Sequence, residues 1–279
     1  MTALLFTLLV WAVATIAGFL GALTGLGGGV VVVPVLALAL GVNIKYAIGA
    51  SLVSVIATSS GAAAAYVKEG YSNIRIGMLL EIATTLGAIL GAYLAAHTST
   101  HAIAIVFGLV LIQSAYHSVF NVPPEAGAAI ESDALGKRLR LGGDFPSEGK
   151  RQEYGVRHVP AGFGLMFGAG ALSGLLGIGS GAVKVIAMDR AMKIPFKVST
   201  TTSNFMIGVT AAASAGVYLS RGYIDPVVAM PVMLGVLGGA FLGTKVLMRA
   251  RVRTLRLVFA SVVLVLAIEM IVNGVRGTV

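Results

Sequence analysis

The sequence predicts an all-α polytopic membrane protein built from two inverted repeats of five hydrophobic segments each. A short glycine-hinged hairpin, re-entrant or broken, is predicted to open each repeat. Three observations predict this fold class: the composition is strongly apolar, the apolar residues form ten runs, and the two groups of five runs repeat at one constant spacing. Together these features exclude an ordinary soluble domain.

The composition shows that most of the chain does not face water. Hydrophobic residues make up 57% of the 279 residues and charged residues only 11%, whereas a soluble domain has roughly 25% charged residues. The net charge of +9 comes from residues between the apolar runs, so membrane topology explains it better than nucleic-acid binding. The absence of cysteine excludes disulfides and thiolate metal sites.

Ten hydrophobic segments are predicted as helices, because a helix satisfies its own backbone in lipid. The opening segment lacks the basic start and cleavage site of a signal peptide and is predicted to stay in the mature chain. The segments span residues 2–22, 28–40, 46–67, 75–96, 101–120, 160–176, 180–193, 199–219, 227–248 and 254–273.

A hydrophilic stretch, residues 121–159, separates the two groups. It is rich in proline, glycine and charged residues, and it is predicted to be an aqueous connector with little apolar surface to bury. The predicted domain organisation is therefore a first transmembrane repeat at 1–120, the connector at 121–159 and a second transmembrane repeat at 160–279.

An ungapped internal repeat relates the two groups. Adding 152 to a residue number in the first group gives its counterpart in the second, from Gly18 to Gly91. Because five is an odd number of segments, the second group is predicted to enter the membrane upside down. Matched pairs include Gly25 and Gly177, Gly27 and Gly179, Gly29 and Gly181, Lys45 and Lys197, Ser51 and Ser203, Thr58 and Thr210, and Tyr66 and Tyr218.

The basic residues predict the orientation. If the amino terminus lies outside, most of the 20 lysines and arginines fall in connections on the cytoplasmic side. Since cytoplasmic loops carry an excess of lysine and arginine, both termini are predicted to be periplasmic and residues 121–159 cytoplasmic.

A glycine-rich hinge precedes a short second segment in each repeat. Residues 29–40 would span only about 18 Å as a helix, so the hinges are predicted to lie at depth. There the free N–H groups of a helix start favour an anion; the alternative is that the glycines serve only turn geometry. The predicted substrate-binding residues of the hinges are Gly27, Gly28, Gly29, Gly179, Ser180 and Gly181.

Hydroxyl side chains recur on one face of the third segment of each repeat. Ser51 and Thr58 share a side of the helix, and Ser203 and Thr210 repeat the pattern, with Asn204 beside them. Ser51, Ser203 and Asn204 are predicted to contact the substrate, and the two threonines are secondary candidates. The alternative is that these hydroxyls bond their own helix or a neighbouring one.

Charged residues inside the apolar segments call for a functional hypothesis. Lys184 lies one turn after the second hinge and is predicted to supply counter-charge to an anion; the alternative is that it snorkels to an interface or pairs with an acid. Glu81 and Glu269 lie nearer segment ends, so an interfacial position is favoured over proton carriage, and Glu81 is kept as a secondary site candidate. Apart from the four-residue step from His97 to His101 across a predicted turn, the sequence shows no metal-ligand spacing. It shows no cofactor motif or catalytic constellation, so neither an enzyme nor a metal site is predicted.

The hinge motifs resemble a known family. The GLGGG run at residues 25–29 followed by Pro34, its echo at 177–181 and the Gly-Ala-x-Leu-Gly motifs at Gly87 and Gly239 resemble the TauE/SafE family, also called the sulfite exporter or four-toluene-sulfonate uptake permease family. The resemblance covers both apolar halves and leaves out 121–159. The second hinge departs from the pattern, with Ser180 for a glycine and Ile186 opposite the proline.

The resemblance implies a secondary active transporter that moves sulfur-containing anions, of the sulfite, sulfonate or sulfoacetate type, across a bacterial inner membrane. Alternating access is the expected mechanism. The alternatives are an uncoupled anion channel and a transporter of carboxylate-type organic anions. The expected partners are a small anion, the lipid bilayer and a coupling ion, proton or sodium; a homodimer is left open, and nucleic acid is not expected.

Overall fold

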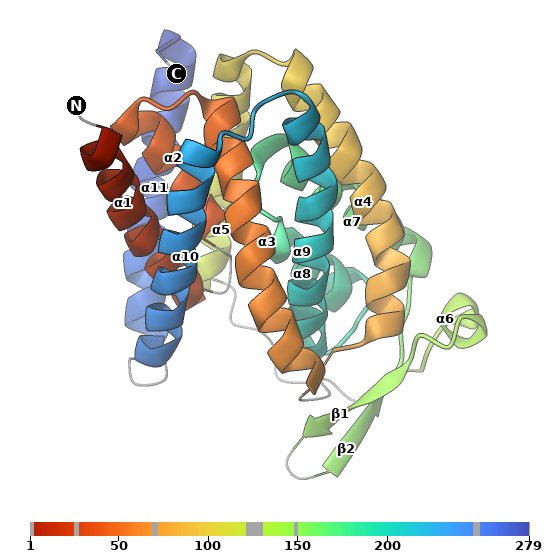
Figure 1. Cartoon of the computed structure of the whole chain (residues 1–279). Coiled ribbons are helices and arrows are strands. Elements are labelled where there is room, and N and C mark those ends of the chain that lie inside the picture. The colour runs from red at the N-terminus through yellow and green to blue at the C-terminus, as the bar shows by residue number, and fades with distance from the viewer. Residues whose placement is uncertain are drawn as a thin grey trace.

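The computed structural model describes residues 3–24, 28–68, 72–120, 131–147, 150–247 and 252–278, and it is a bundle of helices (Figure 1). Each predicted hydrophobic segment forms a helix. These are α1 (Ala3–Thr24), α2 (Gly29–Leu40), α3 (Ile44–Lys68), α4 (Ile74–His97), α5 (Thr100–Phe120), α7 (Val159–Leu176), α8 (Gly181–Ile186), continued by the π-helix η1 (Ala187–Ala191), α9 (Phe196–Ser220), α10 (Pro226–Leu247) and α11 (Val252–Arg276).

The helices have the length and composition of membrane spans. Over their described residues, α1, α4, α7, α10 and α11 each contain a stretch of at least 18 residues that is apolar on average, which is long enough to cross the hydrocarbon core. Large apolar side chains such as Met78, Ile82 and Leu86 are exposed on the outer surface, where only lipid would make exposure favourable. The all-α polytopic fold class is confirmed.

The helix pairs follow the repeat in the sequence. Helix α1 packs along α10, and its counterpart α7 packs along α4, which is the counterpart of α10. Single residues obey the same correspondence: Gly18 faces the backbone of Val236, and Gly170, its match, faces the backbone of Thr84. The equivalent helices α3 and α9 pack against each other, as do α5 and α11. Helix α4 also packs along α9, and α10 correspondingly packs along α3.

Glycines allow these helices to approach closely. A Cβ atom added at Gly87 would collide with the carbonyl oxygen of Phe167 on α7, and one added at Gly239 would collide with that of Thr15 on α1. Gly91 makes the same kind of contact with α7. Such contacts are typical of closely packed membrane helices, so the glycines of the Gly-Ala-x-Leu-Gly motifs serve helix packing at these positions.

Both ends of the chain lie at one end of the bundle, and the connector lies at the other (Figure 1). This agrees with an odd number of passes along the bundle before and after the connector. The short α8 lies among the long helices, behind α3 and α9 in this view, and it reaches neither end (Figure 1).

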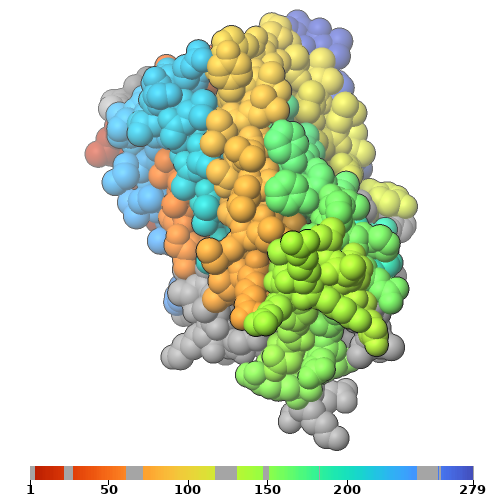
Figure 2. All heavy atoms as spheres, turned by 90° about the vertical axis from the view of Figure 1, so that its right-hand side faces the viewer, coloured from red at the N-terminus to blue at the C-terminus, as the bar shows by residue number. Residues whose placement is uncertain are grey.

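The described part of the connector is folded. It contains α6 (Ala134–Arg138) and an antiparallel hairpin of β1 (Gly143–Ser147) and β2 (Lys150–Tyr154). Leu141, Phe145, Tyr154 and Val156 are buried in one cluster with residues of α4, α7, η1 and α9, and the hairpin lies against the ends of α4 and α7 (Figure 2). The prediction that the connector buries little apolar surface is therefore wrong here. The average composition of the connector is charged, but a few of its apolar side chains pack against the helices.

Hydrogen bonds fasten this hairpin to the bundle. Asn73 caps α4 by accepting a hydrogen bond from the N–H of Ile76, and its Nδ2 donates to the carbonyl of Leu141 at 3.0 Å and to the Tyr154 hydroxyl at 2.7 Å. Burial raises the pKa of Tyr154 to about 12. The hydroxyl therefore stays neutral and keeps its bond to Asn73 at physiological pH.

The loop before β1 has its own cap. Asp133 begins α6 and accepts a hydrogen bond from the N–H of Gly136 at 2.7 Å and another from the N–H of His158. The Gly136 bond is the main reason that the pKa of Asp133 lies below its ordinary value. These bonds join the start of the folded connector to the start of α7.

Candidate functional site

The two hinges meet inside the bundle. A Cβ atom on Gly29, at the start of α2, would lie 3.0 Å from the carbonyl oxygen of Gly177. That oxygen accepts a hydrogen bond of 2.8 Å from the Ser51 hydroxyl on α3. Helix α3 of the first repeat thus holds the hinge of the second. Gly27, a predicted binding residue, lies outside the described residues.

The backbone of the second hinge turns through the left-handed region. Gly177, Gly179 and Ser180 have φ of +68°, +72° and +46°. Glycine adopts this region readily, whereas a serine is strained there, so turn geometry is a sufficient reason for the two glycines. A Cβ on Gly179 would also lie 2.9 Å from Ile207. Turn geometry does not explain the serine at position 180, because a glycine would adopt this backbone conformation with less strain.

The Ser180 hydroxyl is the unusual atom of this hinge. The residue is buried, and its Oγ has no hydrogen-bond partner among the described residues. A buried hydroxyl without a partner is costly. It is therefore a candidate donor to a ligand.

The other hinge residues lie in tight contacts. Gly28 has helical φ, and a Cβ there would meet Val236 on α10 at 2.7 Å. A Cβ on Gly181 would meet Ile207 on α9 at 2.8 Å. The glycines at both positions serve packing, and their backbone groups also adjoin the region where the hinges meet.

The hydroxyls of the third segments divide into two kinds. Ser51 and its counterpart Ser203 are both buried, and each donates to a hinge carbonyl, since Ser203 bonds Gly181 at 3.3 Å. Thr58 instead donates to the carbonyl of Ser54 in its own helix, as the alternative interpretation expected. The serines hold the hinges in place. Asn204 is half-buried on α9, one position beyond the serine.

Lys184 begins a buried chain of polar side chains. Its side chain is fully buried, and its ammonium donates a hydrogen bond to the Thr210 hydroxyl at 2.5 Å. The Thr210 hydroxyl lies 2.8 Å from Oε1 of Glu81, to which it donates. This chain, Lys184–Thr210–Glu81, joins α8, α9 and α4. Lys184 does not snorkel to an end of the bundle, because its head group is engaged here.

Glu81 is buried, and the expectation that it is interfacial is wrong. Only 8% of the residue is exposed. Thr85, one turn later, also donates to Oε1 at 3.2 Å, while Oε2 has no partner among the described residues. The position of Glu81 in the first part of α4 suggested a place at the membrane interface. Helix α9, however, packs over this face of α4 and buries the side chain. The sequence signal that marks Glu81 is an acid in an apolar segment.

An open hollow of about 460 Å³ leads to Glu81 from the outer surface of the bundle. It lies between α4 and α9. Apart from Glu81 and Thr85 its lining is apolar: Met78, Ile82, Leu86, Phe205 and Val209. The hollow thus brings the apolar outer surface of the bundle close to the buried carboxyl of Glu81.

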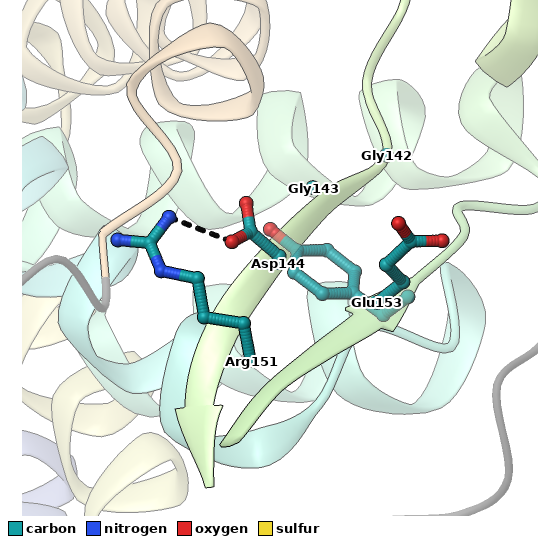
Figure 3. Close-up of a pocket in the computed structure, with 6 residues that line it drawn as sticks. Gly142, Gly143, Asp144, Arg151 and Glu153 are labelled. Atoms are coloured by element: carbon teal, nitrogen blue, oxygen red, sulfur yellow. Dashed lines mark hydrogen bonds and ion pairs between the residues drawn. The ribbon is translucent and has the colours of Figure 1, made fainter. Parts of the chain in front are cut away.

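A second hollow, of about 400 Å³, lies on the hairpin (Figure 3). Arg151 reaches Asp144 with a 2.7 Å ion pair, and the Glu153 carboxylate points away from that pair (Figure 3). The pair is largely exposed to solvent, so it contributes little stability. This hollow is remote from the hinges, and the candidate transport site is the one inside the bundle.

Apolar helices surround two broken segments, and the buried Lys184 of the second segment is joined through Thr210 to the buried Glu81 of α4. This arrangement is typical of a membrane transporter. Residues 10–270 match the family model described as Sulfite exporter TauE/SafE, and the chain belongs to this family. The resemblance of the hinge motifs is thereby confirmed.

Curated relatives carry transporter names. The probable membrane transporter protein YunE of Bacillus subtilis (strain 168) is 27% identical over 267 residues, which cover 93% of this chain and 95% of the relative. YjnA of the same organism, also a probable membrane transporter protein, is 29% identical over 91% of this chain and 95% of its own length. A probable membrane transporter protein of Xylella fastidiosa (strain 9a5c) is 25% identical over 91% of this chain and 90% of its own length. No solved structure matches the chain.

Proposed function

We propose that the protein is a secondary active transporter that moves small sulfur-containing anions, such as sulfite, a sulfonate or sulfoacetate, across the bacterial inner membrane by alternating access. The observation that carries this proposal is Lys184, fully buried one turn after the second hinge. A cation inside an apolar bundle is costly unless a negative partner accompanies it. A transported anion is such a partner.

The anion site centres on Lys184 and Ser180. The ammonium supplies the charge, and the buried hydroxyl without a partner supplies a hydrogen-bond donor. Backbone N–H groups near Gly28, Gly29, Gly179 and Gly181 add donors where side chains are absent. Because α8 has only 6 residues, its dipole is small, and the lysine charge dominates the attraction.

The pairing of helices supports rocking of two inverted repeats. The α1–α10 and α4–α7 contacts correspond under the sequence repeat, and the left-handed glycines of the hinge provide backbone freedom beside the site. Each half then exposes the site to one side in turn. In this proposal the termini are periplasmic and the hairpin is cytoplasmic, as the basic residues favour.

The test is anion uptake by purified protein in liposomes, preceded by a thermal-shift screen against sulfite, methanesulfonate, thiosulfate and carboxylates. A ligand of the folded state raises the melting temperature. Lys184→Met, which keeps the side-chain length, is expected to abolish saturable uptake. Lys197→Met, which removes an exposed lysine of α9, is the matched control and should transport normally.

Three results would contradict parts of the proposal. Normal uptake by folded Lys184→Met protein would remove this lysine from the site. Uptake that neither saturates nor shows counterflow would indicate an uncoupled channel. Stabilisation and uptake with carboxylates alone would replace the sulfur-containing substrate class by organic carboxylates.

A further inference from the structure

We propose that Glu81 binds and releases one proton in step with the anion, so that the protein is a proton–anion symporter. The inference rests on the proposed function, because Lys184 serves both ions. It is carried by the geometry of the Lys184–Thr210–Glu81 chain and by the unpartnered oxygen at the end of that chain.

The carboxyl of Glu81 has one oxygen in use and one free. Oε1 accepts hydrogen bonds from Thr210 at 2.8 Å and from Thr85 at 3.2 Å. Oε2 is buried and has no partner in the described part of the chain. A bare anionic oxygen in an apolar site is costly, and a proton on it removes the charge. Oε2 is therefore the atom that takes up the proton.

Lys184 is the charged group that acts on Glu81. Helix α7, which packs along α4, has no titratable side chain. On the other neighbours, α9 carries Lys197 near its start and Tyr218 near its end, and η1 carries Asp189 and Arg190. Asp189 interacts with Arg190 and with the adjoining Lys193. Within the described residues, a single ammonium thus balances the Glu81 carboxylate.

The Lys184 ammonium cannot fully balance both the Glu81 carboxylate and a bound anion. With Glu81 ionised, Lys184 is held at Thr210 and its charge is compensated. A bound anion would then stand close to the carboxylate in a medium of low dielectric constant, where like charges repel strongly. Protonation of Glu81 removes the repulsion and frees the ammonium for the anion. Proton binding and anion binding therefore favour each other, and this linkage is reciprocal.

The cycle balances in atoms and charge. A proton from water on one side binds Oε2, a singly charged anion binds beside Lys184, and both leave on the other side. Glu81 then returns to the ionised form and pairs again with Lys184 through Thr210. Transport of a singly charged anion with one proton moves no net charge across the membrane.

Uptake of methanesulfonate into liposomes tests this coupling, because its sulfonate stays singly charged across the pH range used. Any pH dependence of uptake then comes from titration of the protein and not of the substrate. For the wild type, an inward proton gradient at zero membrane potential should drive accumulation, and the apparent KM should rise about tenfold per pH unit above the titration of Glu81, the limit for one linked proton.

Glu81→Gln mimics the protonated glutamate permanently. It should keep counterflow of methanesulfonate, lose accumulation driven by the proton gradient, and show an apparent KM that no longer depends on pH. Glu269→Gln is the matched control, since Glu269 is an exposed acid of α11. This control should retain both the gradient-driven accumulation and the pH dependence.

A measurement on the unmodified protein covers the case in which Glu81→Gln does not fold. At a pH above the titration of Glu81, methanesulfonate added to purified wild type in weak buffer should cause uptake of about one proton per bound anion, read with a pH indicator. Binding without proton uptake would overturn the inference. So would accumulation driven by a sodium gradient instead, or accumulation that persists in folded Glu81→Gln.

Two outcomes distinguish a failure of proton coupling from a failure of sulfonate transport. Saturable methanesulfonate uptake that ignores the proton gradient contradicts proton coupling alone and leaves an anion transporter. No saturable uptake of methanesulfonate by the wild type at any pH contradicts the sulfonate transport on which both proposals rest.

Discussion

Ser180 combines two unfavourable features in one residue. Its backbone is left-handed, with φ of +46°, and its buried hydroxyl has no partner among the described residues. Outside glycine, this backbone region costs roughly 1–2 kcal/mol. Strain of this kind is stored at functional sites. The residue is therefore the sharpest test of whether the second hinge binds the anion.

Ser180→Gly should separate the two roles. The glycine relieves the backbone strain, so the protein without ligand should become more stable by about 1 kcal/mol. Loss of the hydroxyl should weaken methanesulfonate binding several-fold. Thermal unfolding with and without the anion measures both effects, and unchanged anion stabilisation would show that the hydroxyl is not a ligand.

The roles of Lys184 and Glu81 depend on the residues that surround them in the fold. Both stand in apolar segments, which marks them as candidates on the sequence alone. Thr210 connects them, and this threonine was only a secondary candidate because its hydroxyl is ordinary in a helix. Side chains 129 residues apart meet here. Only the packing of α4 against α9 brings them together.

Close helix pairs depend on individual glycines, and two neighbours on α7 make a matched test. A Cβ on Gly170 would collide with the backbone of Thr84 on α4, whereas one on Gly168 has nothing within 4 Å. Gly170→Ala should destabilise the protein by about 1–3 kcal/mol through overpacking. Gly168→Ala should be neutral or slightly stabilising, since alanine favours a helix.

Thermal unfolding in one detergent compares these two glycine variants. A lower melting temperature for Gly170→Ala alone is the expected result. Equal melting temperatures would mean that α4 and α7 can separate at little cost, which is incompatible with the close packing described above.

The hairpin is fastened to the bundle through Asn73. This side chain caps α4 and bonds both Leu141 and Tyr154. Asn73→Ala should cost about 1–2 kcal/mol through loss of the cap, and it should also loosen the hairpin. Tyr154→Phe removes one of these bonds and keeps the cap, so it is the milder matched variant.

Limited proteolysis measures how firmly the β1–β2 hairpin is held to the bundle in these variants. Cleavage within residues 131–158 should be fastest for Asn73→Ala, intermediate for Tyr154→Phe and slowest for the wild type, because local opening exposes the chain. The same cleavage rate in all three proteins would show that Asn73 does not hold the hairpin.

The whole molecule has its termini at one end and the hairpin at the other (Figure 1). The sequence contains no cysteine, so single cysteines report their own position only. Ser99→Cys, in the α4–α5 turn, should react with an impermeant maleimide in intact cells. Glu153→Cys, on the hairpin, should react only after the inner membrane is opened. The reverse pattern would invert the proposed orientation.

Apolar runs and glycine spacing were enough to predict the architecture of the bundle. Each helix requires about 20 apolar residues or a clear break, and these are local properties of the chain. The start of α2 at Gly29, directly after the glycine-rich hinge, followed from them. The connector was mispredicted because its buried residues, such as Phe145 and Val156, are few and their burial depends on α4 and α7.

Local pattern decided where the helices of this protein begin and end, because backbone satisfaction in lipid leaves few other solutions. Local pattern also marked Lys184 as unusual. The partners of that lysine and the burial of Glu81 were decided only when α4, α8 and α9 packed together. The same packing buried the Ser180 hydroxyl, which has no hydrogen-bond partner among the described residues. Charge and hydrogen bonding act over a few ångströms, and it is the fold that makes such distances small between residues far apart in the chain.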